Sequence, residues 1–219
     1  MKRKDAFTML ELVMVIVVLG IIAALTIPRL ERDLKQEAAD NILSAIRYTQ
    51  HLALVDDKHK FDDPKWQIRF WHLYFGTCDS KKFYAVGSDD NMDGSDNGRV
   101  DSDESAVDPA TGKLMWAHDG SACTSGTVTI DDLSPNIFIG KKYGVDTITP
   151  SGGCSNKYIG FDHLGRPYGS SFTNSNVPDN SGVLTSVCIF QFDMENGESF
   201  QISIQPETGY AQIVGQSES

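Results

Sequence analysis

Glu11 is the residue whose chemistry most needs an explanation, because it is the only charged residue in the mainly apolar run from Phe7 to Ile27. A carboxylate inside a membrane costs about 2.5–3.5 kcal/mol on insertion scales, and such residues are usually functional. The sequence offers no cation between Asp5 and Arg29 to offset this cost. Cleavage of the chain immediately before Phe7 would create one at a similar depth, the new α-amino group. We therefore expect Glu11 to pair with a free N-terminus.

A second group of residues with possible chemistry lies in an acidic segment at residues 88–104. Its oxygen-bearing side chains alternate and are followed by a glycine, which matches the start of a calcium loop. The twelfth position is Val100, where the motif needs a bidentate Glu, although acids directly after it are close enough to substitute. The sequence leaves two interpretations open, a solvated acidic loop and a distorted calcium site. The candidate ligands are Asp89, Asn91, Asp93 and Asp101.

The four cysteines, Cys78, Cys123, Cys154 and Cys188, all follow the apolar run. An even number of cysteines in an oxidising compartment favours two disulfides, and four cysteines allow three pairings. The sequence cannot choose among these pairings. We favour pairing neighbours in chain order, Cys78 with Cys123 and Cys154 with Cys188. A metal or redox role is disfavoured because no CxxC spacing occurs.

No catalytic constellation is visible in the sequence, which has no GxSxG, HExxH, P-loop or GxGxxG motif. Asp162 and His163 are adjacent, but neighbours on a strand point to opposite faces, so we do not expect them to act as an acid–base pair. We predict that the protein is not an enzyme. The five histidines are scattered, and each is expected to be a surface or edge residue: His51, His59, His72, His118 and His163.

The charge distribution argues against nucleic acid as a partner. The formal net charge is −11, although Lys2, Arg3 and Lys4 precede the apolar run. The rest of the chain is therefore even more acidic, and such a surface repels a phosphate backbone. An apolar fraction of 40% with 22% charged residues is typical of a globular protein that has a core.

The apolar run itself predicts a membrane-spanning helix over residues 7–28. At 1.5 Å rise per residue it is long enough to cross a hydrocarbon core of about 30 Å. Basic residues precede it, so the positive-inside rule places the N-terminus in the cytoplasm and the remainder outside. The alternative, a cleaved signal peptide, is disfavoured because the run is too long and no small-x-small cleavage site follows it.

The stretch Lys4-Asp5-Ala6-Phe7-Thr8-Met9-Leu10-Glu11, followed by Gly20 and Pro28, resembles the prepilin N-terminus of type IV pilins and type II secretion pseudopilins. This resemblance implies that a prepilin peptidase cuts between Ala6 and Phe7 and methylates the new amine. It also implies that Glu11 pairs with the N-terminus of a neighbouring subunit during filament assembly. The family usually has glycine before the cut, and this chain has Ala6.

Beyond Pro28 the sequence predicts an amphipathic helix over residues 29–60. Pro28 has no backbone N–H to donate, so we expect a helix break or kink there. The resemblance implies a helix packed on its own globular domain. Apolar or small residues recur at spacings of three and four: Leu30, Leu34, Ala38, Ile42, Ala45, Ile46, Thr49 and Ala53.

Residues 61–219 are predicted to form a β-rich globular domain, because short strand patterns alternate with loops rich in Gly, Asp and Ser. We expect an antiparallel sheet packed on the helix, an α+β arrangement. The resemblance implies that this arrangement is the pilin fold. The clearest hairpin joins 200–204 to 210–214 through Pro206-Glu-Thr-Gly209. The predicted strands cover residues 66–75, 83–87, 126–130, 136–139, 158–161, 187–192, 200–204 and 210–214.

Residues 159–167 and the final hairpin are similar to the C-terminal pattern of H-type minor pseudopilins. The resulting hypothesis is a minor pseudopilin of a type II secretion filament, with residues 1–6 as a leader peptide, an inner-membrane helix and a periplasmic domain. Its expected partners are other pseudopilins, the prepilin peptidase and the inner-membrane assembly platform. No cofactor is predicted beyond the possible calcium ion. The alternative is a minor pilin of a type IV pilus or competence filament with an adhesive or DNA-capturing role.

Overall fold

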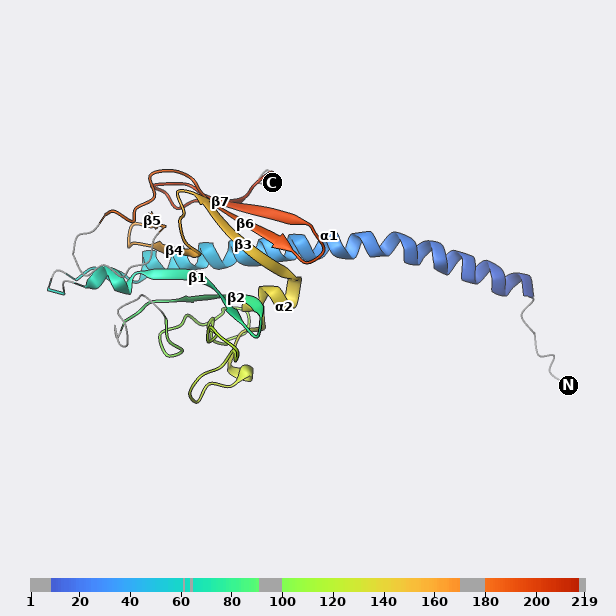
Figure 1. Ribbon diagram of the computed structural model, residues 1–219, viewed down its shortest axis with the longest axis horizontal. Helices are drawn as coiled ribbons and strands as arrows, with labels where there is room; N and C mark the ends of the chain where they lie inside the picture. The colour runs from blue at the N-terminus through green and yellow to red at the C-terminus, as the bar shows by residue number, and fades with distance from the viewer. Residues whose placement is uncertain (1–8, 61, 64, 91–99, 170–179, 217–219) are drawn as a thin grey trace.

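The long N-terminal helix α1 (Met9–Val55) dominates the shape of the molecule. The computed structural model describes residues 9–60, 62–63, 65–90, 100–169 and 180–216, with the backbone alone for 23–33. The front part of α1 projects from a globular domain, and the rear part lies within it (Figure 1). The helix continues through Pro28 without interruption, and the kink or loosening expected there stays a prediction. A proline removes only one backbone donor, and the neighbouring turns can keep the helix intact.

The rear part of α1 is buried along the face that the sequence predicted. Five positions of the predicted stripe, from Ala38 to Ile46 and at Ala53, are at most 4% exposed, and Thr49 is fully buried. Ala39, which was not predicted, is buried as well, and Leu34 is exposed at the edge of the domain. The small alanine side chains let the strands approach the helix closely. α1 contacts β1, β2, β4, β7 and β8 as well as α2.

The helix ends at Val55, before the expected boundary at residue 60. The reason is local polar chemistry in the residues that follow. The Asp57 carboxylate accepts the His59 backbone N–H at 2.8 Å, a bond that forms a turn, and the Asp56 carboxylate accepts from Trp71 at 2.9 Å. The Asp57 side chain competes for a backbone donor in this way and favours a turn over a continuing helix.

The strands form two four-stranded sheets rather than the one that was expected, and every strand pairing described is antiparallel. The first sheet has the order β2-β1-β4-β5 and the second the order β3-β6-β7-β8. The α+β arrangement with the helix packed on antiparallel sheets is therefore confirmed. The strands are β1 (Trp71–Cys78), β2 (Lys81–Gly87), β3 (Val145–Gly152), β4 (Tyr158–Phe161), β5 (Pro167–Tyr168), β6 (Cys188–Met194), β7 (Ser199–Ile204) and β8 (Ala211–Ile213).

Three of the predicted strands are wrong wholly or in part. Residues 66–69 form the 3-10 helix η1 (Trp66–Arg69), and β1 begins only after it. Residues 126–130 form no strand, and the next helix is η2 (Ile130–Asp132). Residues 136–139 lie in η3 (Pro135–Ile137) and at the start of α2 (Ile139–Tyr143). N-terminal capping hydrogen bonds stabilise the short helices η2 and η3 in place of the predicted strands. Thr129 and Asp132 form a capping box at η2, and the Ser134 hydroxyl accepts from the Asn136 N–H at η3.

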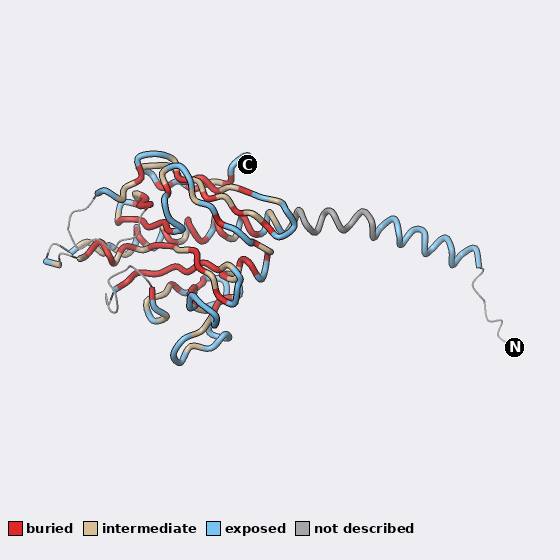
Figure 2. Tube along the Cα trace, in the orientation of Figure 1, coloured by how far each residue is buried: buried red, intermediate tan, exposed pale blue. Residues whose placement is uncertain are grey.

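The hydrophobic core lies between the rear of α1 and the two sheets, where the buried residues gather (Figure 2). Aromatic rings join the sheets: Phe75 of β1 lies 5.4 Å, centroid to centroid, from both Phe190 and Phe192 of β6. Edge-to-face packing of this kind contributes beyond the area that it buries. The two sheets and the helix therefore share one core.

Candidate functional site

The predicted processing and assembly residues lie at the front of the chain. Ala6 and Phe7 lie outside the described residues. Glu11 lies on the exposed part of α1, where every side chain from Met9 to Ile22 is exposed. The large apolar side chains of this segment are between 52% and 88% exposed in the isolated chain. Figure 2 shows this segment as a continuous exposed surface beyond the domain.

Pro28 lies on the same continuous helix as Glu11, and its side chain is outside the described part. Among the residues that the structure describes, no helix is both long and apolar enough to span a membrane. The membrane span over residues 7–28 stays a prediction.

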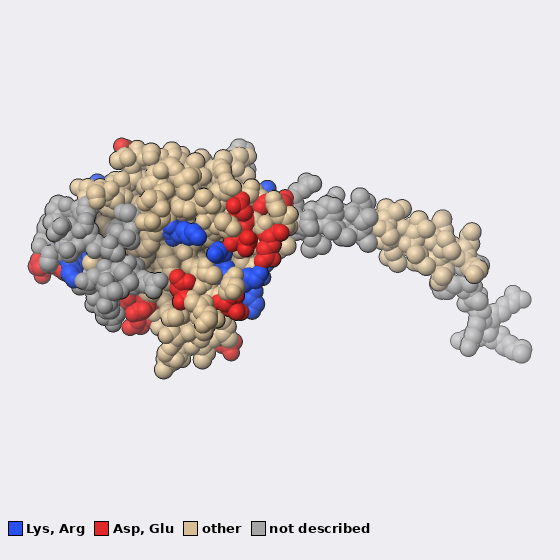
Figure 3. Space-filling model, in the orientation of Figure 1, with Lys and Arg blue, Asp and Glu red and all other residues tan. Residues whose placement is uncertain are grey.

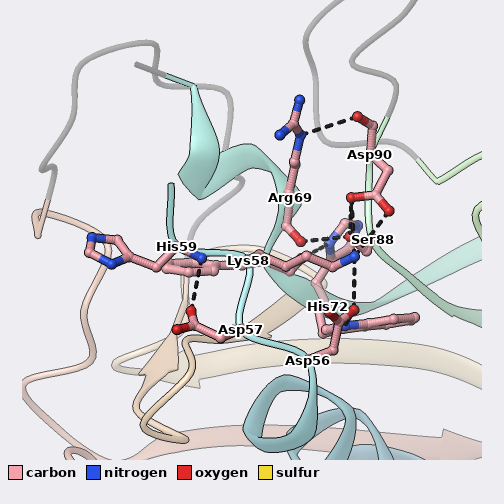
Figure 4. A network of polar contacts seen from close by, with 10 residues as sticks. Asp56, Asp57, Lys58, His59, Arg69, His72, Ser88 and Asp90 are labelled. Carbon is pink, nitrogen blue, oxygen red and sulfur yellow. Dashed lines mark hydrogen bonds and ion pairs between the residues drawn. The ribbon is translucent and has the colours of Figure 1, made fainter. Parts of the chain in front are cut away.

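A network of polar contacts holds the segment directly after α1 to the first sheet (Figure 4). The Lys58 ammonium lies 2.8 Å from an Asp56 carboxylate oxygen and 3.0 Å from one of Asp90. It also lies 5.5 Å from the centre of the Trp71 ring, whose indole N–H donates to Asp56. The half-buried ammonium of Lys58 is thus stabilised by two ion pairs with carboxylates and by a cation–π contact with an aromatic ring.

The pKa values of these groups reflect the network. Burial alone would raise the pKa of Asp56, but hydrogen bonds from Lys58 and Trp71 outweigh it and lower the pKa below the usual range. For Lys58 burial would lower the pKa, and the hydrogen bonds to Asp56 and Asp90 raise it instead. Both groups therefore stay charged at neutral pH.

The same network anchors the start of the acidic segment. The Ser88 hydroxyl donates to the Arg69 carbonyl at 2.6 Å, and the Arg69 Nε donates to the Asp90 carbonyl at 3.1 Å. Arg69 also pairs with Asp63 at 3.0 Å. Ser88, the first residue of the segment, also donates its backbone N–H at 3.3 Å to the carbonyl of Glu104, the last residue of the segment. The base of the loop is therefore closed by protein groups.

The calcium prediction falls only partly on described residues, since Asn91 and Asp93 lie outside them. Asp89 is buried and Asp101 is exposed. Val100, at the twelfth position of the motif, is a core residue whose carbonyl accepts the Trp116 indole N–H at 2.8 Å. Within the described ranges no group of three or more His, Cys, Asp or Glu residues is arranged to hold a metal ion. The calcium site stays a prediction.

The Asp162–His163 pair lies in the turn after β4 rather than on a strand. The Asp162 carboxylate accepts the backbone N–H groups of Leu164 and Arg166 at 3.0 and 2.9 Å, and it pairs with the Arg166 Nε at 2.7 Å. The His163 ring lies 3.8 Å from Asp57 instead. Asp162 thus caps a turn.

The histidines were expected at surfaces and edges, and His72 is an exception because it is fully buried. Its Nδ1 lies 2.8 Å from the Phe70 carbonyl, and its ring stacks on Tyr158 at 4.5 Å. It occupies a core position in β1, since the burial of this strand does not follow a strict alternation. The sequence carried no signal for this placement or for the contacts of Lys58.

Both disulfides have the favoured pairing. Cys78 at the end of β1 is bonded to Cys123, and Cys154 is bonded to Cys188 at the start of β6. The Cα atoms lie 5.1 and 4.9 Å apart, which is usual for disulfides. The first disulfide ties the long connection after β2 to the first sheet, and the second ties the short loop between β3 and β4 to β6 of the second sheet.

Comparisons with known proteins identify a family signature in the N-terminal residues of the chain. A search of curated proteins and a search of solved structures gave no significant match. The match to a family description covers residues 1–27 and is the prokaryotic N-terminal methylation motif. Through these residues the chain carries the signature of type IV pilin-like and pseudopilin proteins.

Proposed function

We propose that this chain is a minor pseudopilin, a structural subunit of a type II secretion filament that assembles through its N-terminal helix. The observation that carries the proposal is the methylation motif at residues 1–27, continuous with a helix whose described front side chains are all exposed. Exposed apolar surface of this extent requires a cover. Lipid provides that cover before assembly, and neighbouring helices provide it afterwards.

In this proposal residues 7–28 cross the inner membrane, with the N-terminus in the cytoplasm and the globular domain in the periplasm. The prepilin peptidase removes residues 1–6, and the assembly platform extracts the trimmed subunit. Glu11 then pairs with the methylated amine of Phe7 on a neighbouring subunit, which offsets the cost of the buried carboxylate. The two disulfides support a domain that lies in an oxidising compartment.

The choice of a type II secretion filament over a pilus rests on the likeness to H-type minor pseudopilins. That likeness involves β4, the turn capped by Asp162, and the hairpin of β7 and β8. Crosslinking mass spectrometry on cell envelopes tests it, because pseudopilin partners are expected and partners from a pilus would favour the alternative.

Processing provides the first test of the proposed function. The full chain is expressed with an active prepilin peptidase, and the mature protein is measured by intact mass and N-terminal sequencing. We expect the protein to begin at a methylated Phe7. The control is the same chain expressed with an inactive peptidase, which should begin at Met1. A chain that still begins at Met1 beside the active enzyme, or that begins far beyond Ile27, contradicts the proposal.

A further inference from the structure

The two disulfides differ in how far their cysteines are buried. Cys154 and Cys188 are 4% and 0% exposed, and both belong to the hydrophobic core. Cys78 is 1% exposed, but its partner Cys123 is half-buried and packs against the core from outside. Thiol–disulfide exchange requires a thiolate to reach one sulfur, so access helps to decide which disulfide reacts. Among the four cysteines, Cys123 is the most accessible to such a reagent.

The surroundings of the two disulfides differ in the same direction. Cys123 lies in an irregular stretch whose neighbours at 121–122 and 125–127 are exposed. The chain around Cys154 is closely packed instead. A Cβ atom at Gly153 would lie 2.3 Å from the Ser186 carbonyl oxygen, and one at Gly169 would lie 3.6 Å from the Cα atom of Cys154. Backbone thus closes in the second disulfide, whereas the first borders on solvent at Cys123.

A hollow of about 590 Å³ gives a route to the first disulfide, because its lining includes both Cys78 and Cys123. Ile130, Leu133 and Phe138 provide apolar surface beside them. The volume is sufficient for a small molecule. Figure 3 shows basic and acidic side chains close together over α2. Charges of both signs line the hollow, from Lys81, Lys113, Lys141, Lys142, Asp79 and Asp131, so a neutral reagent suits it best.

Hydrogen bonds hold the two cysteines near each other independently of the disulfide. The Gly120 N–H donates to the Thr77 carbonyl at 2.9 Å, and the Gly120 carbonyl accepts the Asp79 N–H at 3.0 Å. The Asp119 carboxylate accepts the Thr77 N–H at 3.0 Å. These bonds remain when the disulfide opens, so the two thiols stay at a high effective concentration. Reduction at this position should therefore be reversible.

We propose that Cys78–Cys123 is a site of reversible thiol–disulfide exchange with a neutral dithiol, and that Cys154–Cys188 is a structural disulfide that does not exchange in the folded protein. One thiolate of the dithiol attacks the Cys123 sulfur and forms a mixed disulfide with it. The bond between Cys78 and Cys123 breaks, and its electron pair leaves on the Cys78 sulfur, which takes a proton from water.

The second thiol of the dithiol loses its proton to water and attacks its own sulfur in the mixed disulfide. This step releases Cys123, which takes up a proton, and leaves the dithiol as a cyclic disulfide. Two electrons thus pass from the dithiol to the protein, and a small-molecule disulfide returns the site to its oxidised form. The exchange does not depend on processing or on filament assembly, so its failure would leave the proposed function untouched.

The first test compares the rates at which the two disulfides are reduced. The full chain, purified in a neutral detergent, is treated with dithiothreitol, and free thiols are blocked with N-ethylmaleimide at successive times and located by peptide mass spectrometry. Cys78 and Cys123 should be labelled at least about tenfold faster than Cys154 and Cys188. Equal rates in the folded protein, or faster reduction of Cys154–Cys188, overturn the proposal.

A denatured control attributes the difference to the fold. In concentrated guanidinium chloride both disulfides are open to the reagent, so their rates should become similar. A difference that persists in the denaturant contradicts access as its cause. After native reduction, hydroxyethyl disulfide should restore the Cys78–Cys123 bond, and failure to restore it contradicts reversibility.

A second test identifies the sulfur that is attacked. Mercaptoethanol, a neutral monothiol, should form its mixed disulfide on Cys123 and leave Cys78 as the thiol that N-ethylmaleimide labels. The opposite distribution contradicts Cys123 as the attacked sulfur.

A third test examines the route through the hollow. Ile130 is 55% exposed, so Ile130→Trp should be tolerated and should obstruct the hollow. It should slow reduction of Cys78–Cys123 at least about threefold. Leu164→Trp is the matched control, because Leu164 is 62% exposed and lies outside the lining of the hollow. Equal rates in both variants and the native protein contradict this route.

Discussion

The front and rear parts of α1 have the same secondary structure and opposite surroundings. From Met9 to Ile22 all side chains are exposed, whereas Ala38, Ile42 and Ile46 are buried against the sheets. The front is rich in large aliphatic residues, and the buried stripe of the rear is rich in alanine. A stripe of small residues suits close packing within one chain. A ridge of large residues, exposed in the isolated chain, is suited to contacts with lipid or other chains.

The largest expected effect comes from the front of the helix. Replacing Glu11 with Ala should abolish incorporation into filaments, because the neighbouring N-terminal amine loses its carboxylate partner. Membrane insertion and the melting temperature of the domain should not change, since Glu11 lies outside the domain. Incorporation is measured by fractionating sheared filaments, with Glu37→Ala as the control for loss of an exposed acid on the rear part. Normal incorporation of the Glu11 variant contradicts the assembly mechanism.

The rear of the helix should show the reverse behaviour. Ile46 is fully buried, so Ile46→Ala should lower the free energy of unfolding by about 2–5 kcal/mol. Ile16→Ala makes the same chemical change on the exposed front and should leave the domain's stability unchanged. Denaturant unfolding followed by tryptophan fluorescence measures both. Equal destabilisation by the two variants would show that the parts of α1 are not independent.

A smaller effect is expected from the loop that covers the rear of the helix. Tyr48 of α1 donates its hydroxyl to the Val107 carbonyl at 3.0 Å, next to the buried carboxylate of Asp108. Burial alone would raise the pKa of Asp108, but hydrogen bonds from Ser134, the Ala110 N–H and other donors lower it. We expect Asp108→Asn to cost about 1–3 kcal/mol at neutral pH, because hydrogen bonds to a charged acceptor are lost.

The pH dependence checks the sign of this effect. The pKa of Asp108 is lower in the folded protein than in the unfolded chain, so its stabilisation is complete above about pH 4. It is lost as the pH falls through the folded pKa. Thermal melts of the native protein and the Asn variant should therefore converge below about pH 4. A constant difference at all pH values would contradict a role for the charged carboxylate.

Calcium is expected to have the smallest effect. If the predicted loop binds the ion, titration should release or absorb heat and raise the melting temperature by mass action. Because Asp90 is already paired with Lys58 and Val100 is a core residue, the effect should be modest. Asp89→Asn should reduce it, and Asp131→Asn, an exposed acid outside the segment, should not. A titration that shows no heat and no shift in melting temperature would contradict the calcium prediction.

The elements that the sequence predicted well are those with long or simple patterns. The buried stripe of the helix from Ala38 to Ala53 was predicted because its apolar or small residues recur at spacings of three and four. The hairpin of β7 and β8 was predicted because its apolar residues recur at a spacing of two. The disulfide pairing, which the sequence could not decide, agrees with the preference for neighbours in chain order. β3 was missed because Pro150 interrupts it, and proline is tolerated there since β3 is the edge of its sheet.

The parts that the sequence did not predict depend on contacts between distant residues. The division into two sheets is set by pairings such as β1 with β4, whose partners are far apart in the chain. The network of Lys58 joins residues from the end of α1, from β1 and from the start of the acidic segment. No local pattern encodes such a meeting of charges.

The contacts between α1 and both sheets have a mechanical consequence. A pull along the axis of α1 would act on strands β1, β4, β7 and β8 together, because all of them contact the helix. Such a load shears many packed side chains at once instead of peeling them apart one by one. The domain should therefore resist extraction of its helix by force much better than its equilibrium stability alone suggests, as the proposed extraction of the subunit through its N-terminal helix would require.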